Sequence, residues 1–250
     1  PDKADIHNVL GAALKRQGML ADATESFRQA LRIAPDRADI HVNLGGALLD
    51  RDCMEEALAS FARAVQLDPE LAEAHCGLGT ALARQQRTAE AIGSYREAIR
   101  LRPEMVRAHN DLGNVLLDSG EIAEACACFA QAASLAPGHA EVHSNLAVAL
   151  FAQGRLAEAQ ACCEQALRQD PRLASALTNL GSILSELGKL DEAVVSLRKS
   201  LEARPDHLPT RSQLMHQLAH MCDWDAQAEH GWSPDTRAES DAAIPPFAML

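Results

Sequence analysis

The chain repeats its residue pattern with a period of 34 residues, and this feature limits the folds open to it more than any other. Six copies of the pattern cover residues 4–37, 38–71, 72–105, 106–139, 140–173 and 174–207. Self-similarity at such a period is typical of repeat proteins, in which one small unit of secondary structure is stacked many times. We therefore expect one elongated array of equivalent units and not a single globular core.

Several positions, counted from the first alanine of each copy, hold the same kind of residue throughout. Position 7 is leucine, position 20 is alanine and position 32 is proline in every copy, position 8 is glycine or alanine, and position 24 is mostly aromatic. The leucine and the small residue share one helical face, and the alanine and the aromatic share the next. Each copy is therefore predicted to contain two amphipathic helices.

The residues between and after these helices predict a hairpin. Glycine stands between the two apolar stripes at Gly18, Gly120, Gly154 and Gly188, where a chain that turns back needs a residue tolerant of positive φ. Proline at position 32 cannot continue a helix, so it ends the second one. A hairpin of this length cannot bury its own apolar face, and stacking against its neighbours does so.

These landmarks resemble, position by position, the tetratricopeptide repeat (TPR) family. The resemblance implies an all-α fold, a right-handed α-solenoid (TPR superhelix) of helix-turn-helix hairpins. It also implies a protein-protein interaction module that binds extended peptide or protein partners in a concave groove.

The ends of the chain fall outside the six copies. Residues 1–3 hold positions 32–34 of the pattern, and we expect them to end a preceding repeat in a segment cut from a longer array. Residues 208–229 are predicted to form a C-terminal capping helix. Residues 230–250 are expected to be a linker and an apolar tail, IPPFAML, that lead to an absent domain.

Two short motifs near the C-terminus carry a second resemblance. The segments MCDWD (221–225) and PPF (245–247) look like the junction that follows the repeats in SPINDLY-like and O-GlcNAc transferase-like proteins. This resemblance implies that the chain is the substrate-recruiting, non-catalytic arm of a glycosyltransferase. It places no catalytic residue in this chain.

Net charge and cysteine content limit the kinds of binding partner and the cellular compartment that we expect. The net charge of −12 argues against a nucleic-acid partner, which would need phosphate neutralisation. The seven cysteines form no CxxC pair, and we interpret them as small core residues in a reducing compartment, so we expect a cytoplasmic protein. No apolar run reaches the length of a membrane span, and we expect neither a membrane partner nor a cofactor.

The candidate binding residues come from the first helix of each copy, which in TPR proteins lines the groove. An asparagine amide offers a donor and an acceptor together, so it could hold an extended peptide backbone, as the asparagine ladder of O-GlcNAc transferase-like repeats does. Val9 and Gly77 interrupt the series at position 6. Alternatively, each asparagine bonds the backbone of a neighbouring repeat or faces water. The candidates are Asn8, Asn43, Asn110, Asp111, Asn114, Asn145 and Asn179.

Capture of a chaperone tail is not expected. Chaperone-binding TPR domains grip a terminal carboxylate with a pattern of which only Asn43 is present here, and no copy has lysine at position 5. The acidic residues at position 2 would repel a carboxylate. These residues are Asp5, Asp39, Glu73 and Glu141.

Histidine suggests a metal site in two places, and both are better explained without one. Position 4 is histidine in the first five copies, at His7, His41, His75, His109 and His143. Neighbouring helices lie about 10 Å apart, whereas zinc ligands converge within about 2 Å of one ion, so we predict a structural role. His216 and His220 are spaced as in an H-E-x-x-H motif, but Gln217 replaces the glutamate and a third ligand is missing.

Two other function classes remain to be weighed. The chain could be a structural spacer or a self-association scaffold, which leaves a homo-oligomer open. An enzyme is not expected, because no acid, base and nucleophile converge in the pattern.

Overall fold

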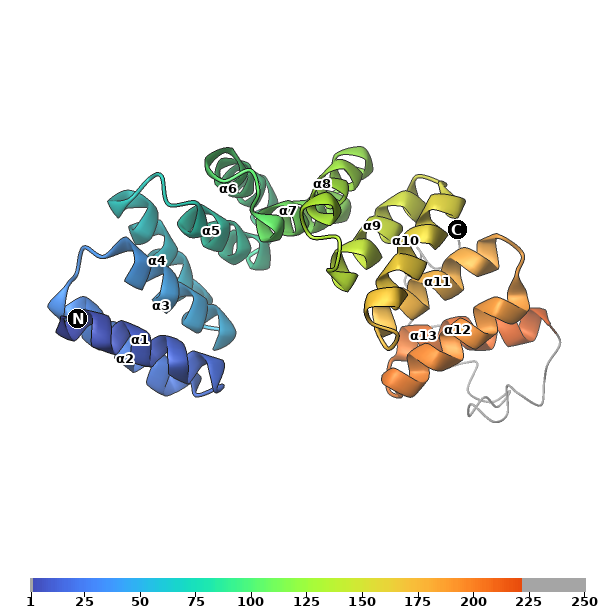
Figure 1. The fold of residues 1–250 in the computed structure, drawn as a ribbon, viewed down its shortest axis with the longest axis horizontal. Coiled ribbons are helices and arrows are strands. Elements are labelled where there is room, and N and C mark those ends of the chain that lie inside the picture. The colour runs from blue at the N-terminus through green and yellow to red at the C-terminus, as the bar shows by residue number, and fades with distance from the viewer. Residues whose placement is uncertain (1, 222–250) are drawn as a thin grey trace. The chain divides into compact units, whose positions relative to one another are not determined.

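The computed structural model describes residues 2–221 as thirteen α-helices joined by short turns, and this part of the chain has no β-strand (Figure 1). The helices are α1 (Lys3–Arg16), α2 (Leu20–Ile33), α3 (Ala38–Asp50), α4 (Met54–Leu67), α5 (Ala72–Arg84), α6 (Thr88–Leu101), α7 (Val106–Asp118), α8 (Ile122–Leu135), α9 (Ala140–Ala152), α10 (Leu156–Gln169), α11 (Ala174–Glu186), α12 (Leu190–Ala203) and α13 (Leu208–His220). The predicted all-α helical-repeat fold is confirmed.

The helices pair into six hairpins, one in each predicted repeat, because each odd-numbered helix from α1 to α11 packs on the helix that follows it. The last helix, α13, packs on α12 and α11 and takes the place that the first helix of another repeat would hold. Its Leu214 and Leu218 are buried. The described helix ends at His220 and Met221 follows in a turn, whereas residues 222–229 of the predicted capping helix, the linker and the apolar tail lie outside the described residues.

The chain divides into two compact units, Pro1–Pro137 and Gly138–Leu250. The first contains α1–α8, and the described part of the second contains α9–α13. Within each unit, every odd-numbered helix contacts the next odd-numbered helix, whereas no two even-numbered helices of the described chain contact each other. The odd-numbered helices of a unit therefore form one continuous layer.

A small residue packed against a large one joins the two helices of each hairpin. A methyl group added at Gly113 would lie 2.7 Å from the Phe129 ring, and one added at Gly45 would lie 2.8 Å from the Phe61 ring. Carbon atoms in van der Waals contact are about 3.5–4.0 Å apart, so only glycine fits beside an aromatic ring here. The fifth repeat has the larger Ala147 at this position and the smaller Cys163 opposite it, both fully buried.

In the turn inside each hairpin, the residue at position 15 adopts a left-handed backbone conformation. Glycine holds it in four repeats, as predicted, with φ between 73° and 83°. Asp52 and Gln86 hold it in the second and third repeats, with φ of 61° and 60°. The backbone of the repeat therefore imposes this conformation even where the residue disfavours it.

Candidate functional site

The candidate residues lie on the odd-numbered helices, on what we call the odd-helix surface: positions 5, 6 and 9 of each repeat. Asn8 lies on α1, Asn43 on α3, and Asn110, Asp111 and Asn114 on α7, all in the first unit. Asn145 lies on α9 and Asn179 on α11, in the second unit. Asn114 is exposed and the others are partly buried.

Asn8 and Asn43 form a bonded pair between neighbouring repeats. The Asn43 Nδ2 donates to Asn8 Oδ1 at 2.9 Å. The side-chain Nδ2 of Asn8 and the side-chain Oδ1 of Asn43 have no protein partner within the described residues. Neither atom is a buried polar atom without a hydrogen bond. The pair thus presents one donor and one acceptor, which is the complement of a peptide group.

Asn179 also bonds the repeat before it. Its Nδ2 lies 3.1 Å from Ser144 Oγ and 3.4 Å from the Ser144 carbonyl oxygen. Like the Asn43 bond, this bond joins position 6 of one repeat to position 5 of the preceding one. Only the contact with the Ser144 carbonyl oxygen is a bond to the backbone of a neighbouring repeat, as the alternative interpretation expects. Asn43 and Asn179 both leave their side-chain Oδ1 without a described partner.

In the fourth repeat, Asp111 belongs to a polar network that the sequence does not reveal. The Arg107 Nε donates to Asp111 Oδ2 at 3.3 Å, and the Arg107 Nη2 donates to Thr80 Oγ1 at 3.3 Å. The hydroxyl of the buried Tyr95 donates to the same Thr80 oxygen at 3.2 Å. This network places a cation beside Asp111, at the junction of the third and fourth repeats.

The interruption of the asparagine series at Gly77 has a steric cause. A side chain at Gly77 would overlap the ring of Phe61, which comes from the preceding hairpin and also packs on Gly45. An asparagine cannot be accommodated at this position unless the ring moves. The gap in the series is therefore a consequence of core packing.

The acidic residues at position 2 are neutralised in the first three repeats. Arg37 bonds both Asp39, at 2.8 Å, and Asp5, at 3.0 Å, and Arg102 bonds Glu73 at 2.5 Å. The hydrogen bond from Arg37 lowers the pKa of Asp39. These carboxylates are therefore internal partners of arginines and not free charges on the surface.

The recurring histidines bind the turn of the preceding repeat. Nε2 lies 3.0 Å from the Pro35 carbonyl oxygen in His41, 2.9 Å from that of Pro69 in His75, and 2.8 Å from that of Pro103 in His109. In α13 the Nη2 of Arg211 donates to the Pro205 carbonyl oxygen at 2.8 Å in the same way. His41, His75 and His109 thus have the predicted structural role, which consists of a specific hydrogen bond to the preceding repeat.

His216 and His220 share one face of α13, with their Nε2 atoms 3.1 Å apart. The described residues hold no group of three His, Cys, Asp or Glu side chains that could bind a metal ion. Over the same part of the chain, no helix is both long and apolar enough to cross a bilayer.

Six cysteines lie within the described residues, and none of these six forms a disulfide there. Burial raises the pKa of the Cys163 thiol to about 12 and that of Cys76 to about 11. Such thiols stay protonated at neutral pH and are poor nucleophiles. The seventh, Cys222, lies outside the described residues.

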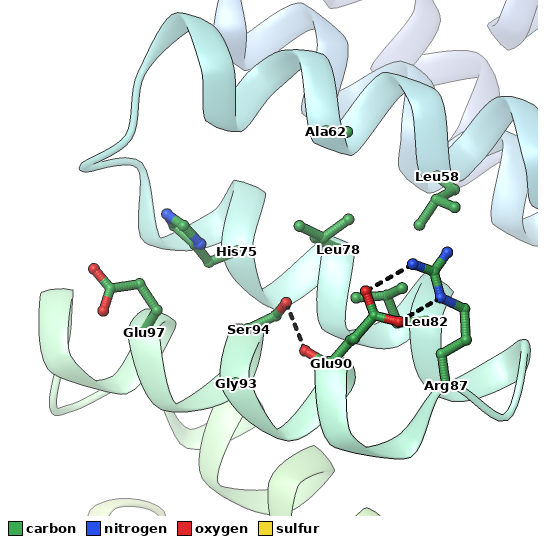
Figure 2. Close-up of a pocket in the computed structure, with 10 residues that line it drawn as sticks. All are labelled: Leu58, Ala62, His75, Leu78, Leu82, Arg87, Glu90, Gly93, Ser94 and Glu97. Atoms are coloured by element: carbon green, nitrogen blue, oxygen red, sulfur yellow. Dashed lines mark hydrogen bonds and ion pairs between the residues drawn. The ribbon is translucent and has the colours of Figure 1, made fainter.

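A groove opens on the other side of the hairpins, between two even-numbered helices. In the first unit it has a volume of about 550 Å³ and lies between α4 and α6, above α5 (Figure 2). Leu78 and Leu82 form its floor, and the Arg87–Glu90 ion pair closes one end. A second groove of about 330 Å³ lies between α10 and α12 in the second unit.

Two models of known protein families match this sequence. The family model described as "Cilia and flagella-associated protein 70 C-terminal domain" matches residues 61–242, and a model described as "Tetratricopeptide repeat" matches residues 8–72. Neither describes a catalytic domain. No curated protein matches the sequence.

Several solved structures share the fold. YrrB, described as "a TPR protein with an unusual peptide-binding site", is 26% identical with a TM-score of 0.61, over 75% of this chain and 96% of that one. PilF of Pseudomonas aeruginosa is 22% identical with a TM-score of 0.76, over 87% and 97%. The Cut9–Hcn1 hetero-tetramer of APC/C contains a chain that is 20% identical with a TM-score of 0.73, over 87% and 43%.

Proposed function

The chain belongs to the tetratricopeptide-repeat family, and from this premise we propose that it is a protein-protein interaction module whose odd-helix surface binds extended segments of partner proteins. The observation that carries the proposal is the Asn8–Asn43 pair, which offers a donor and an acceptor to a peptide backbone. The peptide-binding site named for YrrB, which is 26% identical, supports it.

A peptide-selection experiment tests this proposal. Peptides selected from a random display library on the intact chain would be labelled, and their affinities measured by fluorescence anisotropy. Asn43→Ala should weaken binding at least several-fold, because it removes the acceptor and releases Asn8. Gln29→Ala, which removes an amide from the even-numbered helix α2, is the matched control. Equal affinity for both variants would refute the proposal.

The finer proposal is that the chain recruits substrates for an O-GlcNAc transferase-like protein in the cytoplasm. The MCDWD and PPF segments support it by resemblance, and all of these residues except Met221 lie outside the described part of the chain. The test is to probe the captured partners for O-linked N-acetylglucosamine in cytoplasmic fractions. Partners that bind through the odd-helix surface but never carry the sugar would remove this role and leave the binding module intact.

Self-association is a second candidate, favoured by apolar side chains on α1. Ile6, Val9 and Leu10 are 54%, 69% and 47% exposed. In the later repeats, the residues equivalent to Ile6 are buried. Sedimentation velocity across a concentration series, with Ile6→Ser as the comparison, would detect a dimer formed through this face. A monomer at every concentration would exclude it.

A further inference from the structure

The groove of the second unit has an apolar floor and an exposed apolar wall. Leu180 and Leu184, one turn apart on α11, form the floor, and Leu184 is 3% exposed. Val195 on α12 stands at the wall and is 51% exposed, which is high for a β-branched apolar side chain. At about 330 Å³ the groove is large enough to take apolar side chains of a ligand.

Three carboxylates border this groove and have no cationic partner. Glu164 lies on α10, and Asp191 and Glu192 lie in the first turn of α12. None of the three forms an ion pair with any residue between 2 and 221. Glu164 accepts a hydrogen bond only from the neutral amide of Gln160, at 2.7 Å. One cation, Lys189, lies beside the groove, where its Nζ donates to Gln160 Oε1 at 3.4 Å and forms no ion pair with the described residues. The three carboxylates therefore leave the border of the groove with a net negative charge.

The equivalent groove of the first unit serves as an internal comparison. Its floor residues Leu78 and Leu82 precede Leu180 and Leu184 by three periods, but Gly93 stands where the second groove has Val195 (Figure 2). Its carboxylates are also neutralised, since Glu90 pairs with Arg87 and Glu97 pairs with Arg100, each at 2.7 Å. The first groove thus lacks the free charge, and its apolar wall is formed by Leu58 and Ala62 on α4 and not by a residue of α6.

We propose that the groove between α10 and α12 binds a basic peptide segment that inserts a leucine-sized side chain against Leu180, Leu184 and Val195. Lysine or arginine residues on either side of that anchor pair with Glu164, Asp191 and Glu192. This surface is separate from the odd-helix surface, so the chain can hold two ligands at once. We infer a basic ligand because its charge complements the three carboxylates. We infer an apolar anchor because Val195 exposes an apolar wall.

The probe is a fluorescein-labelled 12-residue peptide of lysine, leucine and alanine, titrated with the intact chain. Replacing Glu164, Asp191 and Glu192 with Gln, Asn and Gln should raise the Kd about tenfold, since each exposed ion pair contributes modestly. Val195→Ser should raise it about fivefold through lost apolar contact. All of these side chains except Val195 are polar, and all lie at the surface, so circular dichroism should show an unchanged fold.

The control has the same change in net charge: Glu90→Gln and Glu97→Gln at the first groove, and Glu104→Gln in the turn that follows α6. These substitutions should leave the Kd within about twofold, because Glu90 and Glu97 are already paired with arginines in the first groove. Equal weakening by both triple variants would show that the peptide senses only overall charge, and would overturn the proposal. So would an unchanged Kd for Val195→Ser, or equal binding of a peptide with glutamate in place of lysine. None of these variants touches Asn8 or Asn43, so the outcome is independent of the odd-helix test.

Discussion

The contact between a glycine and an aromatic ring in the first four hairpins predicts the effect of one added methyl group. In Gly113→Ala the new carbon would lie 2.7 Å from the ring of Phe129, whose side chain is fully buried. The overlap is about 1 Å relative to ordinary carbon contacts. Overpacking of this kind costs about 1–3 kcal/mol, whereas alanine in place of glycine stabilises a helix interior by about 1 kcal/mol.

Gly93→Ala isolates the clash from the helix propensity. Gly93 lies inside α6, is exposed, and has no atom within 4 Å of the position of an added methyl group. This variant should therefore gain the full propensity term of about 1 kcal/mol. The free energies of unfolding of the two variants, measured by urea denaturation with circular dichroism, should differ by about 1–3 kcal/mol. Equal stability would refute the steric argument.

The fifth repeat suggests how to remove the clash. Its Ala147 faces Cys163, so Phe129→Cys should create space for alanine at position 113. Phe129→Cys alone should destabilise by about 3–5 kcal/mol, because it leaves a cavity. Gly113→Ala should then be neutral or stabilising in that background, and the double-mutant cycle should give a coupling of about 1–3 kcal/mol. A clash of the same size in both backgrounds would show that the ring is not its cause.

The turns, the histidine bonds and the buried thiols each give a further measurable expectation. Gln86→Gly should stabilise the chain by about 0.5–1 kcal/mol in urea denaturation, because it relieves a left-handed non-glycine residue; a lower midpoint would contradict this. His109→Phe should cost about 1 kcal/mol by the same measurement, since the Pro103 carbonyl loses its donor; no loss would mean that the bond contributes nothing. Cys76 and Cys163 have pKa values raised to about 11 and 12, so the unfolded chain loses these protons first. The free energy of unfolding should be at its full value below pH 9, the ordinary pKa of a thiol, and should fall by about 1 kcal/mol per buried thiol by pH 10. A urea midpoint that stays constant from pH 8 to 10 would contradict the raised pKa values.

The sequence predicts the architecture because its signals are local and periodic. The six hairpins, the turn glycines such as Gly120, and the small residue opposite the aromatic all depend on spacing within one helix pair. Position 15 shows the limit, because Asp52 and Gln86 adopt the same left-handed conformation without being glycine. There the repeat geometry overrides the local preference.

The candidate surface is less predictable, since its contacts form between repeats. The position of Asn8 beside Asn43, and of Ser144 beside Asn179, depends on how closely successive odd-numbered helices approach. The network around Arg107 depends on rotamers that no spacing encodes. The histidine bonds could have been anticipated, because histidine at position 4 and proline six residues earlier recur with the same period.

The bond from position 4 to the preceding proline carbonyl makes the repeats interchangeable. Every junction of this kind joins equivalent atoms, so removal of residues 38–71 would bring His75 to Pro35 in the place of His41. Whole periods can then be lost or duplicated by recombination without a new junction having to evolve. A deletion that begins at residue 38 and removes one to three whole periods keeps a histidine six residues after Pro35, so a gene encoding such an array can change its length in steps of one period at this junction.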